Sequence, residues 1–135
     1  MSHKRLRVAA FAVYLLLEAV TFAQEGHPLK GAWAGDWGTS AAQRTPLLIV
    51  MDFEGRITGA VNPGTDNLVI KEATLDPNAW ALHFEADGKD RSGQPIKFTF
   101  DGKIENLAMY NRSIKGTWST ATSKGDFKVT RSRGN

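Results

Sequence analysis

Apolar and polar residues alternate along most of the chain after residue 30, in short segments separated by turn residues. The alternation is clearest over 96–104, where Ile96, Phe98, Phe100 and Ile104 are interleaved with Lys97, Thr99, Asp101 and Lys103. A period of two places every second side chain on one face, as in a half-buried β-strand. Shorter runs of this kind cover 30–38, 47–53, 57–61, 67–75, 79–86, 114–118 and 127–131. The pattern predicts eight strands and, after residue 23, no amphipathic helix.

The connections between these segments are short. Asn62-Pro63-Gly64-Thr65-Asp66 has strong turn chemistry, because Pro presets φ and Gly supplies a positive φ. The longest polar loop is 87–95, and Leu107-Ala108-Met109-Tyr110 either caps one end of the fold or continues a strand. Hairpin-length connections favour an all-β fold, an eight-stranded antiparallel up-and-down β-barrel. A β-sandwich is the alternative that the same spacing permits.

Every predicted strand turns large apolar side chains to one face. The inward set is Trp33, Trp37, Ile49, Met51, Phe53, Ile57, Val61, Ile70, Trp80, Leu82, Phe84, Ile96, Phe98, Phe100, Ile104, Ile114, Trp118, Phe127 and Val129. An eight-stranded barrel is just wide enough for such side chains to fill it, or to hold one small ligand. Glycines at positions 35, 59, 102 and 116 remove volume from this face and favour a pocket. The candidate pocket residues are Trp37, Trp80, Phe98, Phe100 and Trp118.

Residues 1–23 have the features of a removable leader. A basic segment, 3–7, precedes the apolar stretch 8–23, and Thr21-Phe22-Ala23 places small residues where a signal peptidase cuts, before Gln24. A membrane anchor is the alternative, but a span needs roughly 20 apolar residues and this stretch contains Glu18. We therefore expect an exported protein, periplasmic or extracellular, without a stable membrane anchor. The mature chain then consists of an extended segment, 24–30, and a β-barrel domain, 31–135.

Charge and cysteine content exclude several kinds of partner and site. The chain has 17 Lys and Arg against 14 Asp and Glu, and the leader holds Lys4, Arg5, Arg7 and Glu18, so the mature net charge is only about +1. No concentrated basic patch remains, which argues against a nucleic-acid partner. The chain has no cysteine, which excludes disulfides and thiolate metal sites. The stability of the domain must therefore come from its apolar core.

Candidate catalytic residues are few. Only His27 and His83 remain after the leader, and His83 alternates with Leu82 and Phe84, so it is expected to face solvent. The aspartates match no calcium loop, and the serines have no base in view. The sequence thus predicts no enzyme, no cofactor and no metal.

Gly31-Ala32-Trp33 in the first strand and Arg131 in the last resemble the calycin superfamily, which includes lipocalins, fatty-acid-binding proteins and avidins. Gly35-Asp36-Trp37 is similarly typical of small exported bacterial barrels. The resemblance implies that Trp33 packs across one barrel end and that the Arg131 side chain lies over its ring and closes that end. A guanidinium on an indole contributes about 0.5–2 kcal/mol.

Two functions follow as expectations. The resemblance and the apolar lumen favour a carrier or sensor of a small apolar molecule. The alternative is a protein–protein interaction module, such as an inhibitor of a secreted protease, with a filled barrel and its contacts made by 24–30 or by the loop 87–95. A polar pocket of the avidin kind is not expected, because the inward face offers almost no hydrogen-bonding groups.

Overall fold

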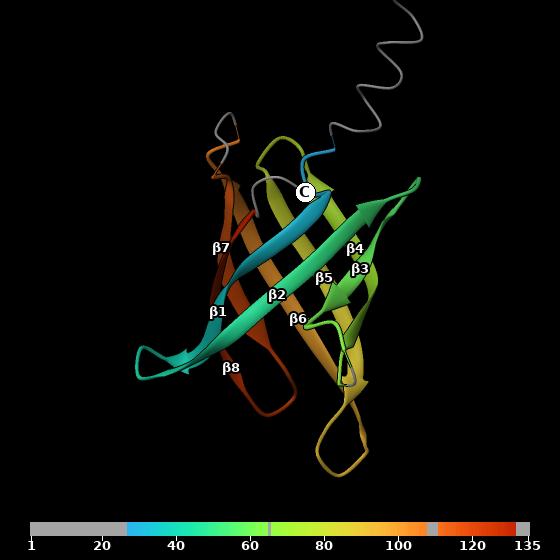
Figure 1. The fold of residues 1–135 in the computed structure, drawn as a ribbon, viewed down its shortest axis with the longest axis vertical. Coiled ribbons are helices and arrows are strands. Elements are labelled where there is room, and N and C mark those ends of the chain that lie inside the picture. The colour runs from blue at the N-terminus through green and yellow to red at the C-terminus, as the bar shows by residue number, and fades with distance from the viewer. Residues whose placement is uncertain (1–26, 65, 108–110, 132–135) are drawn as a thin grey trace, which may run out of the picture.

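Eight antiparallel strands close into a barrel in the computed structural model of the chain, each strand pairing with the next and β8 with β1 (Figure 1). They are β1 (Gly31–Ser40), β2 (Gln43–Phe53), β3 (Ile57–Val61), β4 (Leu68–Asp76), β5 (Ala81–Lys89), β6 (Pro95–Glu105), β7 (Ser113–Ser119) and β8 (Lys124–Arg131). The predicted all-β up-and-down barrel is confirmed, and the β-sandwich alternative is wrong.

The structure describes residues 27–64, 66–107 and 111–131. The predicted leader and its cleavage point lie outside these residues, as does most of the predicted cap at 107–110. Of the predicted extended segment 24–30, the structure describes residues 27–30.

Strands β1 and β2 are longer than the sequence pattern predicts. They meet in a two-residue turn, with Ser40 opposite Gln43, and Pro46 lies inside β2 opposite Asp36 of β1. Proline lacks the N–H that hydrogen bonds between strands require, and residues 43–46 show no apolar alternation. The sequence pattern therefore predicted a strand only from residue 47. The barrel accommodates Pro46 because β2 pairs with β3 only from Ile49 onward, which leaves this part of β2 with one neighbouring strand.

Trp80 lies in a turn and not in the strand predicted at 79–86. Its φ is 51°, in the left-handed region, and β5 begins one residue later at Ala81. The Trp80 carbonyl accepts a hydrogen bond from the amide of Ile104 at 2.9 Å, and its side chain is partly buried against the core. Trp80 continues the alternation of the strand perfectly, so nothing in the period-two pattern could reveal that the turn extends this far.

Large apolar side chains fill the middle of the barrel. Seven of them have no exposed surface: Trp33, Ile49, Val61, Phe84, Phe100, Ile114 and Val129. Phe84 and Phe100 stack with ring centroids 4.5 Å apart, and Phe127 meets Phe100 edge-on at 5.4 Å. Phe53 departs from the predicted inward set, because it is 37% exposed at the end of β2. The filled middle confines any pocket in the lumen to an end of the barrel.

The two ends of the barrel differ. At the end where β1 begins, uppermost in Figure 1, residues 27–30 precede the first strand and Leu29 is only 1% exposed. We call this the plugged end. At the other end lie the β1–β2, β3–β4, β5–β6 and β7–β8 turns (Figure 1). We call it the aromatic end, for the three rings of Trp37, Phe98 and Trp118 gathered there.

Candidate functional site

The aromatic end brings together side chains from three strands. Trp37 of β1, Phe98 of β6 and Trp118 of β7 have ring centroids 5.4–5.9 Å apart. Phe100 lies beneath them, fully buried, with its ring stacked 5.8 Å from that of Trp37. Four of the five predicted pocket residues are thus neighbours. The fifth, Trp80, stands at the plugged end, where β5 begins, and lies apart from them.

Two hollows flank this cluster, and Trp37 and Phe98 form a wall common to both. The larger, about 400 Å³, lies between Trp37, Phe98, Trp118 and the β1–β2 hairpin. The smaller, about 290 Å³, extends from the same two rings toward the β3–β4 and β5–β6 turns. Ligand pockets for small molecules typically hold about 300–1,000 Å³ and are mostly apolar. The aromatic end therefore has room for a small molecule in contact with the rings.

Hydrogen bonds hold parts of this wall in place. The Trp118 indole Nε1 donates to the Gly38 carbonyl at 3.3 Å, which ties β7 to the end of β1. The Trp37 Nε1 has no hydrogen-bond acceptor within the part of the chain that the structure describes. Among the described residues Arg112 Nε is the one buried side-chain polar atom without a partner, so the Trp37 Nε1 is accessible to solvent. The Trp37 N–H is thus available to a ligand in contact with the ring.

A charge cluster stands beside the larger hollow. The Arg44 guanidinium binds the carboxylates of Asp36 and Asp126. Hydrogen bonds that Arg44 donates to Asp36 and then to Asp126 raise the pKa of Arg44, and the bond from Arg44 lowers the pKa of Asp126. Because two carboxylates engage the one guanidinium, Arg44 offers no free positive charge to a ligand, and the rim of this hollow disfavours anions.

The predicted barrel-closing pair lies at the plugged end. Trp33 and Arg131 are register partners on β1 and β8, and Trp33 is fully buried. The Trp33 Nε1 donates to the Leu29 carbonyl at 2.8 Å, so the indole supports the plug as well as the core. The Arg131 Nε lies 3.3 Å from where a Cβ on Gly31 would be. Stacking of Arg131 on the Trp33 ring stays a prediction.

Arg112 also closes the plugged end, and the sequence analysis missed it. Its Nη1 donates to the Pro28 carbonyl at 3.0 Å and its Nη2 to the Leu107 carbonyl at 2.9 Å. Burial, and then the positive charge of Arg131, lower the pKa of Arg112. No sequence pattern marks Arg112, because it stands between two strands and binds backbone carbonyls that come near it only in the folded chain.

We expect His27 to make the stability of the plugged end depend on pH. Its ring stacks on Phe53 with centroids 4.1 Å apart, its Nδ1 accepts a hydrogen bond from the Leu29 amide, and burial lowers its pKa. The unfolded chain therefore binds a proton more tightly than the folded one. Stability is highest above about pH 6.5 and falls as the pH drops through the unfolded pKa toward the lower folded value.

We expect the urea midpoint to decrease from about pH 8 to about pH 5, and the decrease to be smaller in His27→Phe, which keeps the stacking but does not titrate. Both proteins retain His83, so the difference between the two pH profiles belongs to His27. Identical profiles would mean that His27 does not couple the plug to pH.

The described residues contain no group of three or more His, Cys, Asp or Glu side chains able to hold a metal ion. His83 faces solvent as predicted, with 46% of its side chain exposed, and contacts Asp101 on the outside of the barrel. In the same part of the chain no helix is long and apolar enough to cross a membrane.

The fold and the aromatic end define a small closed antiparallel β-barrel with partly open hollows against three aromatic rings. Comparison of this chain with protein-family models, with curated proteins and with solved structures finds no match. The argument for function therefore depends on the geometry of the site.

Proposed function

We propose that this protein is an exported, calycin-like barrel that binds a small, flat, apolar molecule at its aromatic end. The observation that carries the proposal is the wall formed by Trp37 and Phe98, which has a partly open hollow on each side. The middle of the lumen is filled, so the ligand contacts the rings near the mouth and does not enter deeply. The calycin-like features at Trp33 and Arg131 support the same class of protein.

The chemistry of the wall limits the class of ligand that can bind. Aromatic rings prefer offset-stacked or edge-to-face partners, which contribute about 0.5–1.5 kcal/mol beyond the area that they bury. The free N–H of Trp37 adds one hydrogen-bond donor. Arg44 is already neutralised by Asp36 and Asp126. The site therefore suits a planar, mostly apolar molecule that carries an acceptor atom and no negative charge.

The alternative of a protein–protein module, such as a secreted-protease inhibitor, depended on segment 24–30 or loop 87–95. Leu29 is buried and Arg112 binds the Pro28 carbonyl, so the described part of the first segment is held against the barrel. In the loop, the Asp90 carboxylate accepts hydrogen bonds from the amides of Ser92 and Gln94. Residues 27–30 are thus attached to the barrel and are not a free docking segment, whereas the hydrogen bonds at Asp90 lie within the loop itself.

The test compares Trp37→Ala with Trp80→Ala. Each variant loses one partly buried indole, but only Trp37 lies at the proposed site. With the neutral probe N-phenyl-naphthylamine, whose fluorescence rises in apolar surroundings, we expect Trp37→Ala to raise the Kd about tenfold. Trp80→Ala is expected to change the Kd less than about threefold.

Thermal melts establish that both variants are folded before they are titrated. The protein is purified from the exported fraction of its host, and its intact mass reports whether the mature chain begins at Gln24. A parent protein that does not bind the probe saturably, or equal loss of affinity in the two variants, would overturn the proposed site.

A further inference from the structure

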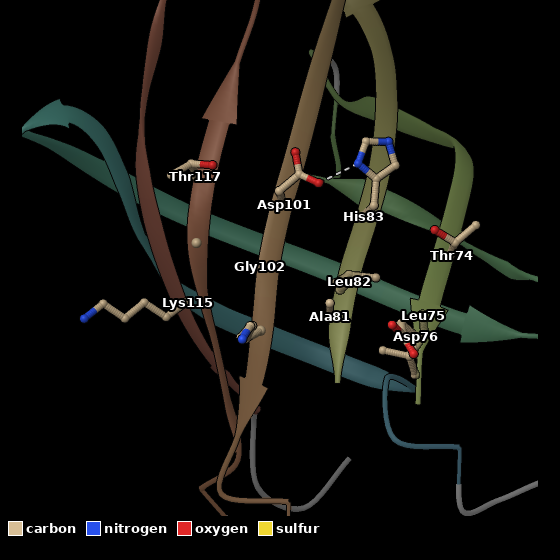
Figure 2. A pocket seen from close by; sticks show the side chains of 12 residues that line it. Thr74, Leu75, Asp76, Ala81, Leu82, His83, Asp101, Gly102, Lys115 and Thr117 are labelled. Carbon is tan, nitrogen blue, oxygen red and sulfur yellow. Dashed lines mark hydrogen bonds and ion pairs between the residues drawn. The ribbon is translucent and has the colours of Figure 1, made fainter. Parts of the chain in front are cut away.

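A further hollow lies on the outside of the barrel and not at either end. It has a volume of about 580 Å³ and extends over β4, β5, β6 and β7 (Figure 2). Two rows of outward side chains border it. Within each row, the residues are register partners on neighbouring strands. The outer hollow shares no lining residue with the two hollows at the aromatic end, so its ligand is inferred independently.

The first row can exchange hydrogen bonds with a ligand. Thr74, His83, Asp101 and Thr117 are successive register partners on the four strands. The His83 Nδ1 lies 2.6 Å from the Asp101 Oδ1, and Figure 2 shows this pair in the middle of the row. An ionised Asp101 only accepts, so the proton of a neutral His83 is on Nδ1 and its Nε2 is an acceptor. The pair thus presents ordered acceptors for hydroxyl groups.

The second row is positively charged. Lys103, Lys115 and Lys128 are consecutive register partners on β6, β7 and β8. Like charges directly opposite each other on neighbouring strands destabilise a sheet. None of the three takes part in an ion pair within the described residues. A bound anion would offset this repulsion, and Lys103 and Lys115 line the hollow.

On β5 a small residue stands in the row of the lysines. Ala81, which continues the second row on β5, is the register partner of both Asp76 and Lys103 and carries only a methyl group. Gly102 and Gly116 lie between the two rows and contribute backbone atoms to the lining of the hollow. In Figure 2 the Lys115 side chain extends from β7 away from the His83–Asp101 pair.

We propose that this outer hollow binds a hydroxylated organic anion, of the chemistry of an acidic sugar. Its carboxylate or phosphate would bind Lys103 and Lys115, and its hydroxyl groups would donate to the His83–Asp101 pair and exchange hydrogen bonds with Thr117. A volume of about 580 Å³ is within the usual range for a small-molecule site. Acidic sugars occur free and as end residues of acidic polysaccharides, and both sources have this chemistry.

The probes are glucuronate, glucose and acetate, which separate the charge from the hydroxyl groups. Titrations are followed by the amide NMR signals of Gly102 and Gly116. We expect saturable shifts with glucuronate and binding at least about tenfold weaker for glucose and for acetate. Equal affinity for glucuronate and either of the other two would overturn the proposal, and so would the absence of saturable shifts.

Matched lysine variants identify which charges contribute to glucuronate binding. Lys103→Ala and Lys115→Ala remove a lysine that lines the hollow, whereas Lys128→Ala removes one from the same row outside it. We expect the first two to weaken glucuronate binding about tenfold and Lys128→Ala less than about threefold. Equal losses in all three would show general attraction to a charged surface and would refute a defined site.

A final titration with polygalacturonate distinguishes the two sources of the ligand. Tighter binding per sugar unit than with glucuronate assigns the site to a polysaccharide, and weaker binding assigns it to the free acid. Neither outcome depends on the aromatic end, because Trp37→Ala should bind glucuronate as the parent does.

Discussion

Trp33→Ala is expected to lower the free energy of unfolding by about 3–5 kcal/mol, because it removes a large, fully buried side chain from the core. The change also leaves the Leu29 carbonyl without the indole N–H that now binds it at 2.8 Å. Urea denaturation followed by far-UV circular dichroism measures the loss. Release of the plug would appear as faster hydrogen exchange of the Leu29 amide.

Trp33→Phe is the matched control for this substitution. It keeps most of the apolar area but loses the hydrogen bond to Leu29, so a loss of only about 1–2 kcal/mol is expected. A loss below about 1 kcal/mol in Trp33→Ala would show that this ring is not part of the core, whatever the effect of the phenylalanine.

Gly35→Ala is the second substitution with a large expected effect. Gly35 of β1 lies opposite Val129 of β8, and a Cβ at this position would overlap the backbone carbonyl of Lys128. That carbonyl belongs to the neighbouring strand and cannot rotate away as a side chain can. The added methyl group must separate β1 from β8, where the barrel closes. We expect destabilisation above about 3 kcal/mol, measured by the urea midpoint.

Gly88→Ala provides the comparison for Gly35→Ala. A Cβ on Gly88 also meets an atom at short range, but that atom is a terminal methyl of the Leu68 side chain, which can change rotamer. Neither glycine has a positive φ, so the two substitutions differ in what the new methyl group meets. We expect Gly88→Ala to cost no more than about 1–2 kcal/mol. Equal costs would mean that the approach of β1 to β8 is not rigid.

The two proposed sites use opposite faces of β6 and β7. On β6, Phe98 and Phe100 turn inward to the aromatic end, while Asp101 and Lys103 border the outer hollow. Because alternate side chains of a strand point to opposite faces, substitutions in one set leave the other set in place. The two sites can therefore be removed independently.

The sequence by itself determined the number of strands and, for most positions, which side chains face inward. The strict alternation over 96–104 predicts Phe100 and Ile104 inside the barrel, and both are buried. The same rule places His83 outside, where it is. These inferences succeed because the period of two is a local property of an extended backbone and needs no knowledge of distant residues.

Only the tertiary structure decided which inward residues meet. Trp37, Phe98 and Trp118 are far apart in sequence, and the closure of the barrel and its register bring their rings together. The same register stacks three lysines on adjacent strands. Trp80 has the same inward parity but lies at the other end, and Arg112 binds carbonyls from distant segments. Parity along a strand determines the face, whereas the position along the barrel axis depends on strand pairing, which no local pattern contains.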